Sequence, residues 1–345
     1  MSTITIKHVA ALAGVSPKTV SRVINGEAHV RPELRETVLR VVGELNYRPN
    51  AFARGLSSAR SFLIAMFFDD PSSSYAADIQ RGALQRCREL SHHLLIEGID
   101  PARADWREQL AATLREVKLG GVILAPPLCD MPEIVDMVRA EGVAVVRIAP
   151  GLNEIDTPQV RMDDRTAARD MTRLLIGHGH REIAFIKGRA GHSAAPLRLA
   201  GFQDAMAEAG LAVADARLPD GDFSFRSGLE AGDALLVADD RPTAIFASND
   251  EMALGVLVAA MRRGIAVPGD LSVVGFDDAP IARMSWPQLT TIHQPKEEMA
   301  AAAVDLLVGP VYREQREDMT LCVELPYTLV RRPSSGPVAG HAPTG

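Results

Sequence analysis

The sequence has few cysteines and no long apolar run. Its 345 residues include three cysteines, Cys87, Cys129 and Cys322. An odd number of widely spaced cysteines fits neither a disulfide framework nor a CxxC pair for zinc or redox chemistry. No apolar run approaches the roughly 20 residues that span a bilayer, and the first residues carry no apolar segment behind a basic start. We therefore expect a cytoplasmic protein that does not enter a membrane.

The sequence also lacks the usual catalytic motifs. It contains no GxSxG, GxxxxGK(S/T), HExxH or GxGxxG pattern. The histidine pairs at residues 92–93 and 178–180 lack the neighbours of a zinc site. Asp277 and Asp278 are adjacent at a strand end, where side chains point to opposite faces, so they are a poor acid–base pair. We expect no catalytic residue, no metal and no cofactor, and a protein that is not an enzyme.

Charge is distributed unevenly along a chain of otherwise ordinary globular composition. Hydrophobic residues make up 47% and charged residues 23%, and the length allows two or three folded units. Residues 1–60 contain nine Lys or Arg against four Asp or Glu, a net charge of +5, whereas the remainder has 28 against 40, a net charge of −12. A small basic module joined to an acidic body indicates that the N-terminal part binds a polyanion.

The basic module has the pattern of a helix-turn-helix. Apolar residues recur at helical spacing from Ile6 to Ala13, and Gly14 ends that helix. Ser16 suits an N-cap and Pro17 a first helical position, so a second helix is expected from residue 17 to about residue 25. A third helix is expected from about residue 32 to residue 45, and its inward side chains would be Leu34, Val38, Leu39, Val42 and Leu45. In such a motif the second helix enters the DNA major groove.

The outer face of this second helix carries hydrogen-bond donors. Lys18 and Arg22 can both reach guanine O6 and N7, because Val20 and Val23 turn toward the core. The hydroxyl groups of Thr19 and Ser21 are suited to hydrogen bonds with phosphate oxygens of the DNA backbone or with nearby bases. These residues by themselves leave open a small helical bundle whose basic face is merely solvated.

Beyond the module, apolar strands alternate with helical patterns. Strands are expected at residues 62–68, 93–99, 121–126, 143–149, 182–188, 244–248 and 272–278. Helices are expected at segments such as residues 75–90, 164–178, 196–209 and 251–263. Apolar runs of this length indicate strands buried on both faces, and the alternation indicates parallel α/β structure. Two similar segments predict two lobes, with ligands at the carboxyl ends of the strands and in the crevice between the lobes.

Three polar residues near strand ends are candidates for ligand binding. Arg198, Asn249 and Asp277 offer donors and acceptors that suit the vicinal hydroxyls of a polyol, since buried polar groups need partners. Structural alternatives stay open for two of them, because Asp277 could cap a turn and Asn249 could cap the helix that follows it.

The basic module resembles the DNA-binding headpiece of the LacI/GalR family of bacterial transcription regulators in the segment TIKHVAALAGVSPKTVSRVINGEAHVRPELRETVLRVVGELNYRPNAFARGL, which starts at residue 5. The resemblance implies that Lys18 and Arg22 read bases. It also implies that His29 lies close to DNA and that Pro17 takes a DNA-facing position that often carries a base-reading side chain in the family. Contacts with the DNA backbone are implied for Ser16, Thr19, Ser21, Asn25 and Tyr47.

The resemblance also implies a hinge helix within residues 50–60. A helix this short is marginal alone because nucleation is costly, so it is expected to order with DNA and a partner copy. Leu56 would enter the minor groove as a wedge that kinks the duplex. The alternative is that Phe52 and Leu56 are linker residues that cap the core of the body. The DNA-facing residues expected in this segment are Asn50, Ala53, Arg54 and Leu56.

The body resembles the family's effector domain, which is similar to periplasmic sugar-binding proteins, as far as Arg332. The resemblance places Phe223 against the ligand ring, although this residue could instead belong to the core. Ala149 and Pro150 stand where the family commonly has an acidic residue followed by a basic one, so no single family member identifies the effector. The implied effector-binding residues are Tyr75, Arg198, Phe223, Asn249, Asp277 and Gln294, with Trp286 as a further candidate.

Together these observations predict an α/β protein with an N-terminal three-helix headpiece and a two-lobed, periplasmic-binding-protein-like parallel α/β domain. The expected segments are a headpiece at 1–49, a hinge helix and linker at 50–60, an effector-binding and dimerisation domain at 61–332 and a disordered tail at 333–345. The tail has no leucine-rich helix of the kind that forms tetramers, so a homodimer is expected.

The predicted function is transcriptional repression. The protein would bind double-stranded operator DNA and repress carbohydrate-utilisation genes, and a small sugar effector would relieve the repression. The alternatives are a regulator that needs a purine or phosphoprotein co-repressor, and a solute-binding protein without a role at DNA.

Overall fold

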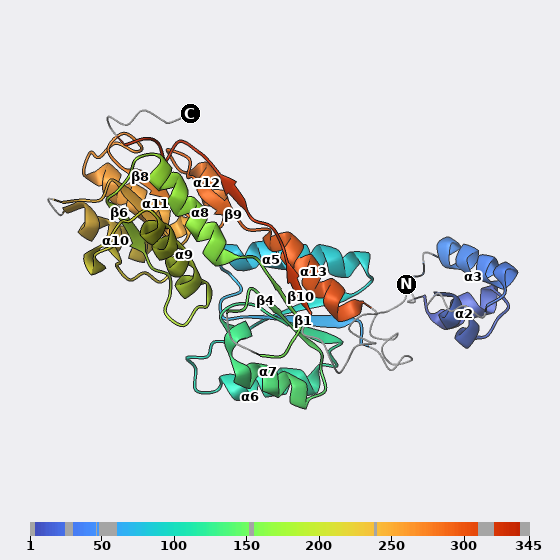
Figure 1. Cartoon of the computed structure of the whole chain (residues 1–345). Coiled ribbons are helices and arrows are strands. Elements are labelled where there is room, and N and C mark those ends of the chain that lie inside the picture. Colours follow the sequence, from blue (N-terminus) through green and yellow to red (C-terminus); the bar gives the residue numbers. More distant parts are fainter. Residues whose placement is uncertain are drawn as a thin grey trace. The chain divides into compact units, whose positions relative to one another are not determined.

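The structure is a computed structural model that describes residues 4–24, 30–45, 47, 61–151, 155–237, 240–309 and 321–338. The chain divides into two compact units, residues 1–62 and residues 63–345 (Figure 1). Within the described residues, no helix is long and apolar enough to cross a bilayer.

In its described residues, the first unit contains three helices, α1 (Ile6–Leu12), α2 (Pro17–Ile24) and α3 (Pro32–Glu44). Gly14 has a φ of 65° in the turn after α1, a conformation that a side chain disfavours. The Ser16 hydroxyl accepts a hydrogen bond from the Thr19 amide at 3.1 Å and caps α2, as the sequence predicted. The prediction for Leu39 was wrong, because this residue is exposed and Val41 faces inward in its place. The buried core consists of Val9, Ala10, Val20, Val23, Val38 and Val41.

The first lobe of the second unit is a parallel sheet with helices on both faces. Its strand order is β10-β5-β4-β3-β1-β2. The strands are β1 (Leu63–Phe68), β2 (His93–Gly98), β3 (Gly121–Leu124), β4 (Val145–Ile148), β5 (Gln159–Arg161) and β10 (Cys322–Glu324). The helices are α5 (Ser74–Glu89), α6 (Trp106–Glu116), α7 (Pro132–Ala140) and α13 (Lys296–Val308), with a short η1 (Leu128–Asp130). Successive residues of β1 face α5 and α13 on one side and α6 and α7 on the other, so this strand is buried on both faces.

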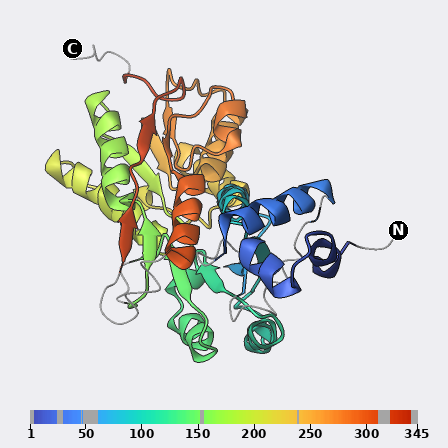
Figure 2. The same cartoon turned by 90° about the vertical axis from the view of Figure 1, so that its right-hand side faces the viewer.

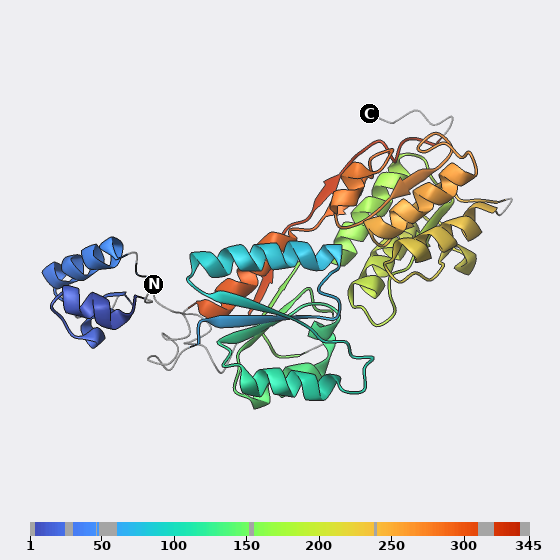
Figure 3. The same cartoon turned by 180° about the vertical axis from the view of Figure 1, so that it is seen from behind.

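The second lobe repeats this layering around a smaller parallel sheet of order β6-β7-β8. Its strands are β6 (Ile183–Ile186), β7 (Ala244–Ala247) and β8 (Ser272–Val274). Its helices are α8 (Asp164–Gly177), α9 (Ala194–Glu208), α10 (Phe225–Val237), α11 (Asp250–Arg262) and α12 (Pro280–Met284), with a short η2 (Asp215–Arg217). Phe185 of β6 packs toward α8 and α9, whereas Ala184 and Ile186 pack toward α10 and α11. Figure 2 and Figure 3 show the two lobes from other sides.

The chain passes between the lobes after β5, after β9 (Thr291–His293) and after β10. β9 pairs antiparallel with β11 (Thr328–Val330). The two-lobed parallel α/β fold that the sequence predicted is therefore confirmed. One expectation about strand burial is not met: β2 is an edge strand whose Ile96 is 40% exposed, because only β1 pairs with it.

The expectation of a disordered tail from residue 333 differs from the structure at residues 333–338. Ser334 is 0% exposed, and its hydroxyl donates to the Val273 carbonyl at 2.6 Å and accepts from the Thr290 amide at 2.8 Å. The Ser334 carbonyl accepts from the Val273 amide at 2.8 Å. The segment therefore satisfies the free edge of β8, which the proline and glycine content of the tail did not reveal.

Candidate functional site

A cavity of about 270 Å³ lies between the two lobes. Residues that follow the carboxyl ends of β1, β3, β4, β6, β7 and β8 line it, as expected for parallel sheets. All six residues of the predicted effector set line this cavity: Tyr75, Arg198, Phe223, Asn249, Asp277 and Gln294. Further polar lining residues, which the sequence did not single out, are Asp69, Asp70, Ser73, Ser74, Asp164, Arg189, His192, Asp222, Ser224 and Glu251.

The guanidinium of Arg198 forms the polar centre of the cavity wall. Its Nε donates to Asp164 Oδ1 at 2.8 Å, and its Nη1 donates to the Ser248 carbonyl at 2.6 Å. The same Nη1 lies 3.6 Å from Asp277 Oδ1, and the group sits 3.7 Å from the ring centroid of Phe276. Arg198 is only 4% exposed, so these partners must compensate for the loss of water.

Close contact between α8 and α9 brings Arg198 to Asp164. A Cβ at Gly201, one turn after Arg198, would lie 2.0 Å from the backbone carbonyl oxygen of Arg165 on α8. Only glycine fits there, and its absence of a side chain lets the two helices approach. The motif RLAGF therefore supplies both the charged group and the small residue that positions it.

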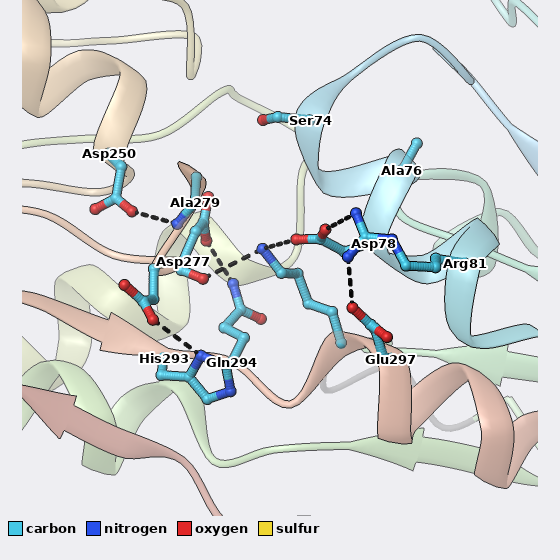
Figure 4. A network of polar contacts seen from close by, with 12 residues as sticks. Ser74, Ala76, Asp78, Arg81, Asp250, Asp277, Ala279, His293, Gln294 and Glu297 are labelled. Carbon is cyan, nitrogen blue, oxygen red and sulfur yellow. Dashed lines mark hydrogen bonds and ion pairs between the residues drawn. The ribbon is translucent and has the colours of Figure 1, made fainter. Parts of the chain in front are cut away.

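Several residues around the cavity hold backbone angles that favour glycine. Asp277, Asp278, Phe223 and Ala149 have φ values of 118°, 49°, 72° and 46°. Such conformations persist only where surrounding contacts enforce them, and they gather at binding sites. Asp277 accepts a hydrogen bond from Gln294 Nε2 (Figure 4).

Asp278 has separate partners, and its carboxylate accepts from Arg283 at 2.8 Å and from Arg332 at 2.6 Å. Asp278 does not line the cavity, whereas Asp277 does. The two adjacent carboxylates therefore serve different sites, as the sequence predicted.

Burial makes the carboxylates of this site costly to ionise. Desolvation raises the pKa of Asp164 and of Asp277, although the positive charge of Arg198 opposes the shift in both. Desolvation also raises the pKa of the Tyr75 hydroxyl, with a further contribution from the charge of Asp164. A ligand that brings hydroxyl donors to these oxygens would stabilise their charged form.

Asn249 and Phe223 have structural contacts as well as positions in the cavity wall. Asn249 Oδ1 accepts from the Met252 amide at 3.0 Å and caps α11, while its Nδ2 donates to the Phe223 carbonyl at 2.8 Å. The ring centroid of Phe223 lies 5.0 Å from that of His192. The helix-cap alternative for Asn249 is thus realised together with its place at the cavity.

The further candidate Trp286 does not lie at the cavity. It is 93% exposed, lies just after α12, and is not among the residues that line the cavity. Asp164 and His192 are the most informative residues that sequence reasoning missed. Asp164 was read only as the start of a helix, and its approach to Arg198 depends on helix packing that a sequence pattern does not show.

The candidate nucleic-acid interface is the outer face of α2. Lys18 and Arg22 are exposed and four positions apart, so they share a face of the helix. Tyr47 is partly buried and packs against the helical core of this unit. Ser16, Thr19 and Ser21 lie at the start of α2 or on its partly exposed side. The predicted DNA contacts Asn25, His29, Asn50, Ala53, Arg54 and Leu56 lie outside the described residues.

Comparisons with known proteins agree with this arrangement. Residues 5–50 match the model of the bacterial regulatory proteins of the lacI family, and residues 172–335 match that of a periplasmic binding protein-like domain. The chain is 34% identical over 336 residues to catabolite control protein A of Priestia megaterium, covering 96% of this chain and 99% of that relative. It is 35% identical over 323 residues to the ribose operon repressor of Escherichia coli K12, covering 92% and 97%.

A solved structure of the Lac repressor dimer bound to operator and the anti-inducer ONPF superposes with a TM-score of 0.80 and 28% identity. The match covers 97% of this chain and 100% of the other. A helix-turn-helix unit and a two-lobed ligand-binding domain define a class of transcription regulators. The chain belongs to the LacI family of bacterial DNA-binding regulators.

His192 is partly buried in the cavity wall, and the protonation of its ring can be tested. Desolvation lowers the pKa of His192 to about 3, with smaller contributions from Arg198 and Arg189. Its Nδ1 is buried and finds no hydrogen-bond partner among the described residues. The neutral ring therefore favours the folded state above the usual pKa near 6.5, and that contribution is lost as the pH falls toward 3.

We expect His192→Gln to weaken the acid sensitivity of the protein. Between pH 7 and pH 5, wild type should lose up to about 2 kcal/mol more of its free energy of unfolding than the variant, since the unfolded histidine binds a proton over this range. Denaturant titrations at both pH values measure the difference. His93→Gln is the control, because His93 is exposed on β2. Equal pH dependence in wild type and His192→Gln would show that the ring is not held neutral by burial.

Proposed function

We propose that this LacI-family regulator is a repressor of carbohydrate-utilisation genes, and that a small sugar in the cavity between the lobes releases it from its operator. The observation that carries the proposal is the arrangement of Arg198 between two buried carboxylates, Asp164 and Asp277. Together these groups offer donors and acceptors within one cavity, which suits adjacent hydroxyls that both donate and accept. The apolar edge of Phe223 supplies a surface for the carbon face of a sugar ring.

The sugar can act only by preferring one arrangement of the lobes. Residues of both lobes line the cavity, so a ligand there has different contacts when the lobes rotate. A coupling free energy of about 1 to 3 kcal/mol would change operator affinity by roughly 5- to 150-fold. This role needs no chemical step, and DNA as the target implies action in the cytoplasm.

A purine or phosphoprotein co-repressor is the rival mechanism. It would tighten the operator complex, whereas a sugar inducer would weaken it. A solute-binding role without DNA would give no use to the helix-turn-helix unit, whose α2 exposes Lys18 and Arg22.

Operator selection followed by ligand titration tests the proposal. The full chain would select duplexes from a random library, and fluorescence anisotropy would measure affinity for the selected palindrome. Titration with D-ribose, D-xylose, D-glucose, D-galactose, hypoxanthine and guanine should yield at least one sugar that weakens operator binding by about 5-fold or more. A purine that tightens binding, with no response to any sugar, would favour the rival.

Two variants assign the effects to the two units. Arg22→Ala should lose about 1 to 3 kcal/mol of preference for the selected duplex over random DNA, while its affinity for the sugar stays unchanged. Asp277→Ala should keep operator affinity and lose the response to sugar. If the sugar weakens operator binding by Asp277→Ala as much as by wild type, the cavity is not the site at which the sugar acts.

We also propose that the active species is a homodimer. Met284, the last residue of α12, and Trp286, two residues later, are 80% and 93% exposed. A monomer gains nothing from exposing two large apolar side chains together, whereas a symmetric interface would cover them. A dimer would also match the two half-sites of a palindromic operator.

Charge at this surface should split the dimer. Met284→Asp/Trp286→Asp is expected to sediment as a monomer and to bind the operator about 100-fold more weakly or worse, because the headpieces no longer act as a pair. Leu39→Asp, at an exposed apolar residue of α3, is the control that should stay dimeric. A double variant that sediments like wild type would place the interface elsewhere.

A further inference from the structure

Behind the ligand cavity, a buried lysine bridges the two lobes. Lys296 is the first residue of α13 and is only 4% exposed. Its Nζ lies 2.7 Å from Asp78 Oδ2 of α5 and donates to the main-chain carbonyl of Asp277 at 3.2 Å. Lys296 does not line the cavity that holds the proposed sugar site. Its contact is therefore with the backbone of a cavity-lining residue and not with the cavity itself.

The first-lobe end of this bridge is rigid. Arg81, one turn after Asp78, contacts Asp78 at 3.0 Å and Glu297 of α13 at 2.6 Å (Figure 4). A Cβ at Gly82 would lie 2.2 Å from the backbone oxygen of Glu297, so the backbones of α5 and α13 touch. The ammonium group is thus fixed relative to the helix pair that covers one face of the first sheet.

The second-lobe end of the bridge is a residue with a constrained backbone. Asp277 has a φ of 118°, and its carboxylate is tied to Gln294 and lies near Arg198. A ligand that displaces the backbone of Asp277 would therefore also displace the carbonyl that Lys296 contacts. If the lobes rotate away, a buried ammonium donor loses its acceptor, which is unfavourable. Other contacts between the lobes, such as Arg189 with Asp69, are more exposed and contribute less.

We infer that Lys296 is a positioning residue that couples the effector site to the lobe arrangement, by holding the backbone of Asp277 against Asp78 of α5. The inference rests on the proposed function, in which a sugar contacts Asp277. It assigns to Lys296 a part in the response to the ligand, and no contact with the ligand itself. Its loss should therefore uncouple operator affinity from sugar binding.

The test compares the sugar response of four proteins. The response is the ratio of operator dissociation constants with and without a saturating concentration of the sugar, taken from the six-compound panel above, that weakens wild-type binding most. We expect a ratio of at least about 5 for wild type and below about 2 for Lys296→Met. The double variant Asp78→Asn/Lys296→Met removes both partners of the Lys296–Asp78 ion pair, so neither charge is left without the other. It should show the same ratio as Lys296→Met, because the second substitution affects an interaction that the first has already removed. This double variant carries the test if Lys296→Met does not fold.

Arg86→Gln is the matched control. Arg86 joins the same two helices through Asp305 at 2.7 Å, but this ion pair lies within the first lobe and does not involve Asp277. It should keep the wild-type ratio even if its melting temperature falls. If the folded variants that lack Lys296 respond to the sugar as strongly as wild type does, the coupling role is overturned and the proposed function stands. A wild-type protein that binds operator and responds to no sugar would overturn both.

Discussion

The buried guanidinium of Arg198 is the group on which the rest of the second unit depends. It is withdrawn from water, so the protein must supply acceptors in fixed places: Asp164 at the start of α8, the Ser248 carbonyl after β7 and Asp277 after β8. These acceptors come from three separate elements of the second lobe, and the close packing of α9 on α8 is what lets one side chain reach them. The polar groups on this side of the cavity are therefore arranged around one buried charge.

The same arrangement explains how a ligand in the cavity could influence distant parts of the molecule. The carboxylate of Asp277 belongs to the charge cluster, while its carbonyl contacts Lys296, which is fixed to α5 in the first lobe. Asp277 has a φ of 118°, and a displacement of its backbone would move both groups. Under the proposed function, a sugar that binds better to one lobe arrangement would shift the population toward it, which is the condition for any allosteric effect.

Much of this could be predicted from sequence, and the failures have physical causes. Helical and strand periodicity located the headpiece helices and the alternating sheets, and strand-end polarity identified Arg198, Asn249 and Asp277 as lining residues. Periodicity does not reveal which strand lies at a sheet edge, so the exposure of β2 was missed. The proline and glycine content of the tail predicted disorder at Ser334, but the hydroxyl of this residue is hydrogen-bonded to partners about 60 and 40 residues away in the sequence. The partnership of Asp164 with Arg198 depends on helix contacts that no local pattern encodes.

Calorimetric titration of Arg198→Lys with the active sugar tests the central claim most directly. Lysine keeps the positive charge, but it lacks the planar, forked set of donors of a guanidinium. It therefore cannot make the contacts of Arg198 with Asp164, the Ser248 carbonyl and Asp277 at the same time. The account predicts a folded protein, with unchanged circular dichroism, whose sugar affinity falls at least about 30-fold, equivalent to about 2 kcal/mol. A folded Arg198→Lys protein that binds the sugar as tightly as wild type would contradict it.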